Sequence, residues 1–597
     1  MVILCLSALS LSSVSAQTKA GQQGLSQHGL ALHGSPRLAP DTPLPYADRT
    51  APDGGRITFG VAGSFDTLNP FVVRGISAQG ISPPMGLVFQ SLMLRSADEP
   101  FALYAGLARS VSLSADGKAL TVYLDPQARF SDGQPVTAQD VKFSWGLLKE
   151  KGRPNYRNTY AKVTRLTVHD PLTLTFEWED EDQELPLILA MMPVLPEHKT
   201  DAARFEETTL TPPLGSGPYR VGEVKPGESI TYQKNPDFWG RNKAIYQGLY
   251  HPDTIRYDYY RDANALFEAF KGGLVDVRIE DNPTRWATGY DFPAMRDGRA
   301  MRETIPIGIA KGMNGFVFNT RKDVFKDKQV REALNEMLDF DWINSRLFNS
   351  LYRRSDSFFT GSELSSARKP ATAQERALLA PFAASVRPEI LEGQWQPAQL
   401  DGSGRDRKAA QRALALLEKA GYRLDDGQLK NRQGALLQFE ILVNTRLQEK
   451  LALNYAQSLQ RIGVSASVRL IDDIQYWRRL SAFEFDMIQY NYAGTPSPGN
   501  EQYHRWGSRA ATRQGSLNYA GAQDPAIDAM IEAMLNARTP ETYLSAVHAL
   551  DRVLLSGFYV VPLFHAPDLW FARKTSIGRP KTTPLFGTAP ETFWVIP

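Results

Sequence analysis

Apolar and polar residues alternate in several short stretches of the chain, and this pattern predicts β-strands. Leu120, Val122 and Leu124 alternate with more polar residues, so one face of that stretch is apolar. The Asp-Gly pair at 116–117 is typical of a tight hairpin turn, because glycine accepts a positive φ without steric cost. A half-buried strand that follows a hairpin turn is therefore predicted at 120–124.

A helix is predicted after this strand and a second turn. Thr137 is a typical N-cap residue, and Asp140 three positions later suits both a capping box and the positive end of the helix dipole. The apolar residues that follow fall on two faces of a helix, which predicts that much of the helix is buried. The polar, aromatic stretch at 154–160 beyond the helix is predicted to be a loop.

The rest of the chain alternates between short apolar runs and stretches with helical spacing, which is typical of an α/β protein. Further strands are predicted at 54–61, 164–168, 172–176, 255–260, 272–278, 315–320, 436–444, 464–470, 485–492 and 560–564. Further helices are predicted at 85–92, 263–270, 327–338, 406–420, 447–461, 473–481, 524–535 and 541–555. With 597 residues the chain exceeds what one hydrophobic core supports, so two or three domains are predicted.

Charge and composition are those of an ordinary globular protein. The 67 basic and 65 acidic residues give a net charge of +2 and no long run of one sign. This balance excludes the strongly basic surface that is typical of nucleic-acid binding. Cys5 is the only cysteine and lies in the N-terminal apolar run, so disulfides and cysteine-based metal sites are excluded once that run is removed.

The first residues are predicted to be an export signal. Residues 1–16 form an apolar run that ends in small residues, so cleavage after Ala16 is predicted. Residues 17–50 are rich in Gly, Gln, Ser and Pro and are predicted to be a flexible N-terminal segment. No other stretch approaches the roughly 20 apolar residues of a transmembrane helix. These features predict an exported, soluble product.

The sequence lacks the common catalytic motifs. Its eight histidines are scattered, with no H-E-x-x-H and no pair at the spacing of helical metal ligands. It contains no G-x-S-x-G elbow, Walker A loop or dinucleotide fingerprint. The paired carboxylates of a glycoside hydrolase are not excluded, because 65 acidic residues offer many pairs. We expect no enzyme, no cofactor and no metal. A secreted hydrolase acting on peptides or glycans, or a chaperone-like binding module, is the alternative.

The stretch from Phe130 to Val141 reads F-S-D-G-Q-P-V-T-A-Q-D-V. It resembles F-x-D-G-x-P-h-T-A-x-D-V, with h apolar, the signature of the family 5 extracellular solute-binding proteins, which are the peptide-binding components of bacterial ABC importers. Further stretches resemble the same family in the same order, at 215–219, 232–239, 318–320, 330–334 and 416–422. The stretches at 51–57, 63–66, 256–262, 265–271, 285–288 and 340–341 resemble its Yej-type branch, which binds oligopeptides and microcin C.

The resemblance implies an α/β fold of two lobes, the class II or cluster C type of periplasmic binding protein, with an extra subdomain in the first lobe. The core of lobe I is predicted at 51–88, 205–310 and 566–597, the extra subdomain at 89–204, and lobe II at 311–565. The chain is predicted to cross between lobes near 315–320 and 563–570.

The resemblance also implies a partner and a location. We expect a periplasmic monomer that captures an oligopeptide or peptide-like ligand between its lobes, with hinge closure around it. Delivery to ABC permease subunits with a cytoplasmic ATPase is implied, and no nucleic acid takes part.

Three stretches are expected to line the cleft: the loop after an Asn-Pro turn, the segment at 154–160 and the strand that begins at Phe485. Two tryptophans in polar surroundings are added to them. The predicted ligand-binding residues are Arg74, Asn155, Tyr156, Tyr160, Trp286, Tyr490, Asn491, Tyr492 and Trp506. Core packing is the alternative for each aromatic residue, and a surface role is the alternative for Arg74.

One position departs from the pattern of the best-known oligopeptide binders. Their aspartate that pairs with the free amine of the peptide would fall near Thr495 in this chain. The ammonium anchor is therefore missing or supplied elsewhere, which permits longer or modified peptides.

Overall fold

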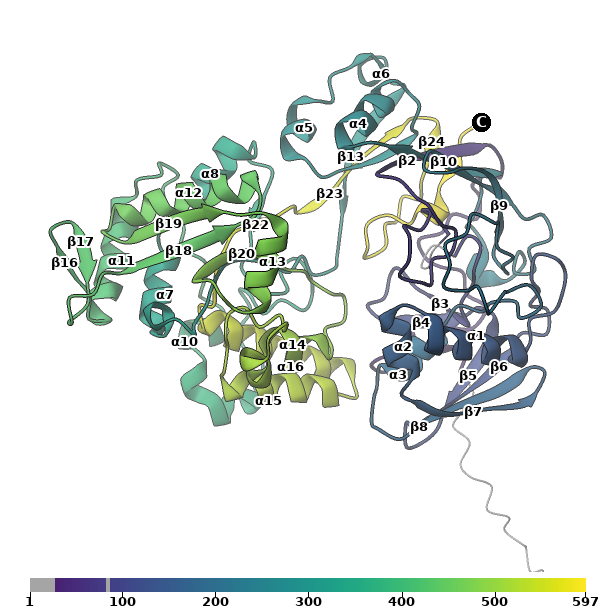
Figure 1. Cartoon of the computed structure of the whole chain (residues 1–597), viewed down its shortest axis with the longest axis horizontal. Helices are drawn as coiled ribbons and strands as arrows, with labels where there is room; N and C mark the ends of the chain where they lie inside the picture. Colours follow the sequence, from purple (N-terminus) through teal and green to yellow (C-terminus); the bar gives the residue numbers. More distant parts are fainter. Residues whose placement is uncertain (1–26, 82–85) are drawn as a thin grey trace, which may run out of the picture.

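Two lobes lie side by side in the computed structural model of the chain, which describes residues 27–81 and 86–597 (Figure 1). A seven-stranded sheet forms the centre of lobe I, and a five-stranded sheet forms the centre of lobe II. The predicted α/β fold with two lobes is confirmed. The predicted signal peptide at 1–16 lies outside the described residues.

The sheet of lobe I combines parallel and antiparallel pairs. Strand β2 is parallel to its neighbours β11 and β12, and the other pairs are antiparallel. The strand order is β13 (Ala300–Pro306), β23 (Asp568–Lys574), β12 (Val277–Glu280), β2 (Arg56–Ala62), β11 (Thr254–Tyr260), β10 (Ser229–Lys234) and β9 (Tyr219–Lys225). Helices α4 (Ala263–Lys271), α5 (Pro283–Thr288) and α6 (Pro293–Arg296) lie on this lobe near β13 (Figure 1).

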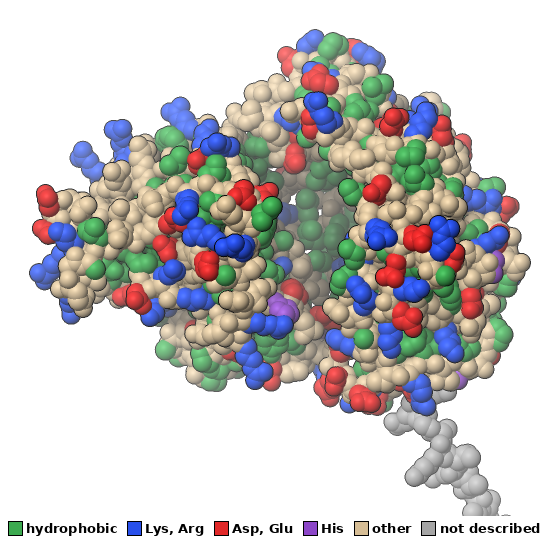
Figure 2. Space-filling view, in the orientation of Figure 1, with side chains coloured by type: hydrophobic (Ala, Val, Ile, Leu, Met, Phe, Trp, Pro, Cys, Tyr) green, Lys and Arg blue, Asp and Glu red, His purple; other side chains and the backbone are tan. Residues whose placement is uncertain are grey.

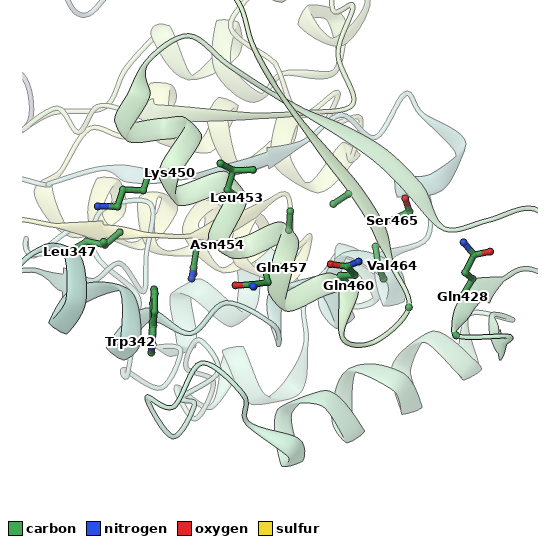
Figure 3. A pocket seen from close by; sticks show the side chains of 14 residues that line it. Trp342, Leu347, Gln428, Lys450, Leu453, Asn454, Gln457, Gln460, Val464 and Ser465 are labelled. Carbon is green, nitrogen blue, oxygen red and sulfur yellow. The ribbon is translucent and has the colours of Figure 1, made fainter.

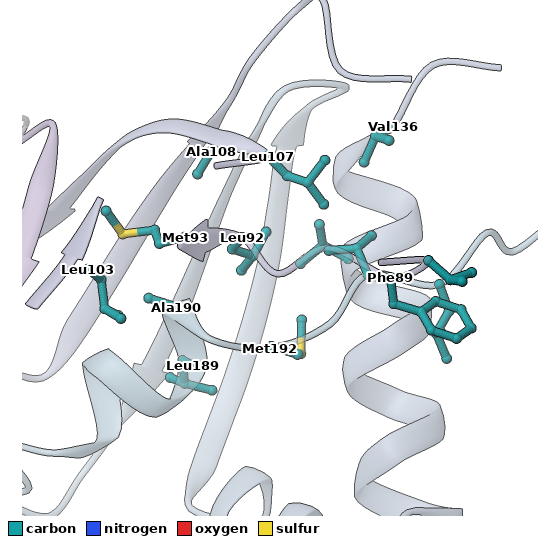
Figure 4. Close-up of a cluster of buried hydrophobic side chains, with 14 of the residues drawn as sticks. Phe89, Leu92, Met93, Leu103, Leu107, Ala108, Val136, Leu189, Ala190 and Met192 are labelled. Carbon is teal, nitrogen blue, oxygen red and sulfur yellow. The ribbon is translucent and has the colours of Figure 1, made fainter. Parts of the chain in front are cut away.

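One smaller sheet and two of the three strands of another lie within 89–204, the range predicted as an extra subdomain of lobe I, and the third strand lies in the segment predicted to be flexible. The four-stranded sheet has the order β5 (Ala108–Leu113), β6 (Ala119–Leu124), β8 (Thr173–Trp178) and β7 (Val163–Asp170). The three-stranded sheet has the order β1 (Gly29–Ala31), β4 (Ala102–Ala105) and β3 (Met93–Arg95). Helices α1 (Ala138–Lys151), α2 (Pro154–Tyr160) and α3 (Leu185–Ala190) pack nearby, and Figure 4 shows buried apolar side chains gathered between these elements, among them Leu92, Leu103, Leu107 and Met192.

Helix α1 begins where its capping signal predicts. The Thr137 side chain accepts the N–H of Asp140, and the Asp140 carboxylate accepts the N–H of Thr137 at 2.9 Å. This capping box satisfies two backbone donors that a helix start leaves without partners. The alternation of β6 is also confirmed, because Leu120, Val122 and Leu124 are fully buried while the residues between them are half-buried.

Lobe II is an α/β layer with helices on both faces of its sheet. The strand order is β19 (Ser465–Leu470), β18 (Gln438–Val443), β20 (Met487–Tyr492), β14 (Met313–Phe318) and β21 (Val560–Pro562). Its helices are α7 (Lys328–Asn335), α8 (Phe340–Leu347), α9 (Ala373–Leu379), α10 (Pro388–Leu391), α11 (Arg407–Lys419), α12 (Arg446–Gln460), α13 (Asp473–Ser481), α14 (Glu501–Trp506), α15 (Pro525–Asn536) and α16 (Pro540–Ser556). Three two-stranded pairs complete the described strands: β15 (Arg353–Arg354) with β22 (Phe564–His565), β16 (Arg423–Asp425) with β17 (Gln428–Lys430), and β24 (Ile577–Gly578) with β25 (Trp594–Val595).

The chain passes between the two large sheets twice. The first crossing is at 307–312, between β13 and β14, and the second is at 566–567, between β22 and β23. The first lies just before the predicted position and the second lies inside the predicted range. Every strand of the seven-stranded sheet falls in the ranges predicted for the core of lobe I, and the boundaries themselves stay a prediction.

Two predicted elements are wrong. The helix predicted at 85–92 is absent from its described part, 86–92, where carbonyl groups of Val88 and Leu87 instead accept the N–H groups of Gly217 and Tyr219, each at 2.8 Å. Because these backbone carbonyls bond to another segment, their hydrogen bonds are satisfied without a helix. The loop predicted at 154–160 is the short helix α2.

The described part of the segment predicted to be flexible, residues 27–50, packs against the rest of the chain. Strand β1 pairs with β4, and Leu44 and Tyr46 are buried in the core of lobe I. Although this segment is mostly polar, a few buried apolar residues are enough to anchor it to lobe I. Within the described residues, no helix has the length and apolarity needed to cross a membrane.

Candidate functional site

A hollow separates the two lobes, and apolar side chains are visible deep inside it (Figure 2). We call this hollow the interlobe cleft. The two crossing segments join the lobes, so a rotation about them would widen or narrow the cleft.

The lobes also touch at a second place, away from the crossings. The ring of His33 in lobe I stacks on the ring of Tyr543 in lobe II, with centroids 3.9 Å apart and an angle of 27°. The Asn500 amide donates to the Glu184 carboxylate across the same contact at 3.5 Å. A pocket of about 250 Å³ lies here, lined by 31–37 and 99–102 from lobe I and by 363–364, 496–497 and 540–544 from lobe II.

Burial changes the acid–base properties of this second contact. Burial lowers the pKa of His33 to about 4, so its ring is neutral at pH 7. Burial raises the pKa of Glu184, and the nearby charge of Glu501 raises it further. Burial at this contact therefore disfavours the charged form of each group.

Strand β20 carries three of the predicted residues at one end of the lobe II sheet. Tyr490 is half-buried and Asn491 is exposed, whereas Tyr492 has only 3% of its surface exposed. Rings of Tyr490 and Tyr492 are 4.9 Å apart, and Tyr492 lies 4.5 Å from Trp506, which is itself buried. The structure thus brings Tyr490, Tyr492 and Trp506 together, while Asn491 lies on the opposite face of the strand.

Two amide groups beside this strand end have a buried oxygen with no hydrogen-bond partner within the described residues. The Gln489 amide donates to Asn314 at 3.2 Å, and its Oε1 is unpaired. The Asn444 amide, just after β18, donates to Asp473 at 2.8 Å, and its Oδ1 is unpaired. Unpaired buried acceptors are costly in a folded protein and often mark a functional position.

The loop with Arg74 and helix α2 lie together in lobe I. Arg74 is exposed between Val73 and Ile76, whose side chains are 64% and 63% exposed. The loop is held in shape by the N–H of Ile76, which donates to the Asp66 carboxylate at 2.6 Å. The N–H of Arg153, at the start of α2, donates to the carbonyl of Phe71 at 2.8 Å.

Helix α2 places its three predicted residues at different depths. Asn155 is exposed, Tyr156 is half-buried and Tyr160 is fully buried. The Tyr156 ring lies 5.6 Å from Tyr160 and 6.4 Å from Phe71. Tyr160 therefore has the position of a core residue, with Tyr156 between it and the surface.

Trp286 is separate from the other predicted residues. It is buried, and its ring stacks on Trp570 at 6.2 Å with an angle of 11°. The Trp570 ring also lies 5.7 Å from Tyr352 of lobe II. Trp286 thus belongs to an aromatic group beside the second crossing rather than to the strand end or to helix α2.

Two further pockets lie in lobe II. One of about 700 Å³ lies between α8, α12 and the start of β19, and Figure 3 shows Trp342, Leu347 and Leu453 around it. None of the nine predicted residues lines it. The other, of about 830 Å³, is lined by Gly308 of the first crossing and His565 just before the second. Its lining also includes Arg353, Arg354 and Arg368, none of which was predicted. Among the described residues, no group of three or more His, Cys, Asp or Glu side chains is arranged to hold a metal ion.

Comparison with known proteins identifies the family. Residues 102–514 match the model described as bacterial extracellular solute-binding proteins, family 5 Middle. A Brucella melitensis protein named only as a binding protein is 46% identical over 560 residues, 93% of this chain and 91% of the relative. The peptidoglycan-binding protein YepA of Agrobacterium fabrum is 40% identical, over 92% of each chain. The protein named as probable peptide-binding protein YejA of the same organism is 36% identical, over 92% of this chain and 90% of the relative.

Solved structures share the fold at lower identity. The oligopeptide-binding protein AppA of Bacillus subtilis, in complex with a nonapeptide, has a TM-score of 0.60 and 20% identity, covering 92% of this chain and all of AppA. NikA of Brucella suis, in complex with Fe(III)-EDTA, has a TM-score of 0.65 and 18% identity, covering 91% of this chain and all of NikA. Because their ligands differ so widely, this fold alone does not fix the ligand. The chain belongs to the bacterial extracellular solute-binding proteins of family 5, in their Yej-type branch.

Proposed function

We propose that this protein is the substrate-binding component of an ABC importer that captures oligopeptides. The observation that carries the proposal is the interlobe cleft between two lobes that are joined by two short crossings. A cleft between domains is a common place for a ligand, and hinge closure would bury the ligand. Delivery to membrane permease subunits with a cytoplasmic ATPase would follow.

The accessible predicted residues are our proposed ligand contacts. They are Arg74, Asn155, Tyr156, Tyr490 and Asn491. The buried ones, Tyr160, Tyr492 and Trp506, would support these contacts from beneath. An extended peptide held through its backbone would leave its side chains in roomy, hydrated surroundings, which tolerates many sequences.

The remaining parts of the proposal concern the mature protein. We propose a periplasmic monomer that has lost residues 1–16, with the core of lobe I formed by 51–88, 205–310 and 566–597, its extra subdomain by 89–204, and lobe II by 311–565. Its ligand would leave unchanged, as expected of a family of binding proteins.

Peptides released from peptidoglycan are a second candidate for the ligand. The relative named as peptidoglycan-binding is 40% identical to this chain, and the one named as peptide-binding is 36% identical. Both candidates are peptides, so one experiment separates them.

The test measures thermal stability and binding heat of the purified mature protein with two sets of ligands. One set is alanine peptides of about three to nine residues, and the other is the soluble products of peptidoglycan digestion. A ligand at 100 times its Kd adds about 2.7 kcal/mol to the free energy of unfolding. Mass spectra recorded afterwards should show intact peptides. Cleavage products, or stabilisation by sugars and metal ions but by no peptide, would refute the proposal.

A further inference from the structure

The pocket of about 700 Å³ in lobe II is a groove that runs along one side of helix α12. Figure 3 shows Trp342 of α8 at one end of this groove, Gln428 of the β16–β17 hairpin at the other, and the side chains of Asn454, Gln457 and Gln460 between them. The hairpin lies at the end of lobe II that is farther from lobe I (Figure 1). A volume of this size is typical of a ligand site, and the residues proposed to contact the peptide do not line it.

Helix α12 presents two different stripes of side chains. Leu451, Tyr455 and Leu459 are buried in the core of lobe II, as the 3.6-residue period of a helix requires. The groove is lined by the neighbouring stripe, which extends from Lys450 to Gln460. An exposed stripe is usually rich in charged residues, but Lys450 is the only charged side chain among the described residues that line the groove. The polar groups of the groove are therefore almost all neutral.

Four amide side chains have their polar groups available to a ligand. Those of Gln428, Asn454, Gln457 and Gln460 make no hydrogen bond to any residue that the structure describes. The three glutamines are exposed, and Asn454 is half-buried. Each amide offers two N–H donors and one carbonyl acceptor, and a hydroxyl group can pair with either kind. This row of amides therefore suits a ligand with several hydroxyl groups and no charge.

Trp342 gives the groove an aromatic wall that is held in place. The Asp339 carboxylate accepts the N–H of Trp342 at 3.0 Å and the N–H of Gly404 at 2.7 Å. Gly404 fits closely against the indole, since a Cβ at this position would lie 3.2 Å from Trp342 Cδ1. The half-buried ring packs on the core of lobe II, and its N–H has no hydrogen-bond partner within the described residues. A ring fixed in this way loses little conformational freedom when a ligand packs on it.

The lining of the groove does not suit several other classes of ligand. Its described residues include no His, Cys, Asp or Glu for a metal ion. One lysine without any arginine is a poor site for a phosphate or a carboxylate. Along α12 the apolar Leu453 and Ala456 alternate with amides, so no continuous apolar surface is present for an acyl chain. A ring that has apolar C–H groups on its face and hydroxyl groups on its edge matches this mixture.

We propose that this groove binds a neutral carbohydrate and is a second ligand site, separate from the interlobe cleft. The ring of Trp342 would cover the apolar face of one sugar unit. The amides along α12 would bind the hydroxyl or N-acetyl groups of the units that follow. Because the groove continues from α8 to the β16–β17 hairpin, an oligosaccharide fits it better than a single sugar. The inference goes beyond the proposed function, since the protein would bind a sugar and a peptide at the same time.

The test uses three neutral trisaccharides on the mature protein: tri-N-acetylchitotriose, maltotriose and cellotriose. Binding is measured by titration calorimetry, both without peptide and with a saturating amount of the tightest-binding alanine peptide. The variants are Gln457→Ala, at an exposed site that should not affect folding, and Trp342→Phe, which keeps an aromatic ring. The control is Gln475→Ala, the same change at an exposed site on α13 that does not line the groove.

At least one trisaccharide should bind, and the peptide should leave its Kd unchanged. Gln457→Ala should weaken this binding about three- to tenfold, which is the effect of losing one hydrogen bond between neutral groups. Gln475→Ala should bind the sugar as the native protein does. In NMR spectra of the native protein, the indole N–H signal of Trp342, identified by its absence from Trp342→Phe, should shift when the sugar is added.

Four other outcomes would overturn the inference. The first is that none of the three sugars binds, and the second is that the native protein, Gln457→Ala and Trp342→Phe all bind with the same Kd. Displacement of the sugar by peptide would place the sugar in the interlobe cleft. A dimer in sedimentation that Gln457→Ala dissociates, without sugar binding, would make the groove a contact between protein chains. Failure of every peptide to bind refutes the proposed function alone, because the sugar is also measured without peptide.

Discussion

Replacing Tyr492 with alanine tests whether this residue belongs to the core behind the proposed ligand contact Tyr490. Tyr492 is 3% exposed, and its ring lies 4.9 Å from Tyr490 and 4.5 Å from Trp506. Removing a buried aromatic ring costs about 3–5 kcal/mol, because it leaves a cavity that the neighbours fill only in part. At about 2 °C per kcal/mol for a domain of this size, the melting temperature should fall by roughly 6–10 °C.

The partner variant is Tyr490→Ala. Tyr490 is half-buried, so the stability loss should be clearly smaller, while binding of the best peptide should weaken if Tyr490 contacts it. Scanning calorimetry gives the stability of both variants, and titration calorimetry below both melting temperatures gives their Kd values. Tyr492→Phe, which keeps the ring, should lose less than about 1.5 kcal/mol. A Tyr492→Ala protein with native stability and lost binding would refute the depth that we assign to this residue.

Three further predictions concern other parts of the molecule. Glu375→Ala should lower the free energy of unfolding in urea by about 3–5 kcal/mol, because it leaves the buried Arg552 unpaired. Burial raises the pKa of Glu375, but hydrogen bonds from His548 and Arg552 lower it overall. The stabilisation from this pair should therefore be lost as pH falls below about 4. An unchanged midpoint at pH 7 would contradict this. Thr137→Ala should cost about 1 kcal/mol, and Thr137→Ser much less. The pKa of His33 is about 4 when its ring is stacked and about 6.5 when it is exposed. The contact of His33 with Tyr543 between the lobes should therefore weaken from pH 7 to pH 5, which X-ray scattering would detect as a larger radius of gyration. His33→Ala should remove this pH response.

Local sequence signals were reliable where a few neighbouring residues determine the structure, as they do at the start of a helix. Thr137 caps α1 as predicted, and Asp524 accepts the N–H of Ala526 at the start of α15, where a helix was predicted from 524. Helix α2 was missed because it has no side-chain cap and its residues are mostly polar. Its fixed place comes from Tyr156 and Tyr160 packing near Phe71, a contact that no local pattern contains.

The depth of the site residues could not be read from the sequence for a related reason. Tyr490 and Tyr492 are two positions apart on a strand, so they share a face and have the same pattern. Trp506 and Phe358, from distant parts of the chain, lie 5.0 Å apart and belong to the same core as Tyr492.

The position of β23 has a consequence for how the chain acquires its fold. This strand lies between β12 and β13 in the sheet of lobe I, yet it is synthesised only after all of lobe II. Until it arrives, each of those two strands has a free edge, which is the kind of surface that pairs with other chains. Contacts between such distant parts of a sequence also form slowly, because a long loop must close first. Lobe I, most of which is made first, is therefore completed last, and a nascent chain needs protection at that sheet for as long as lobe II takes to emerge.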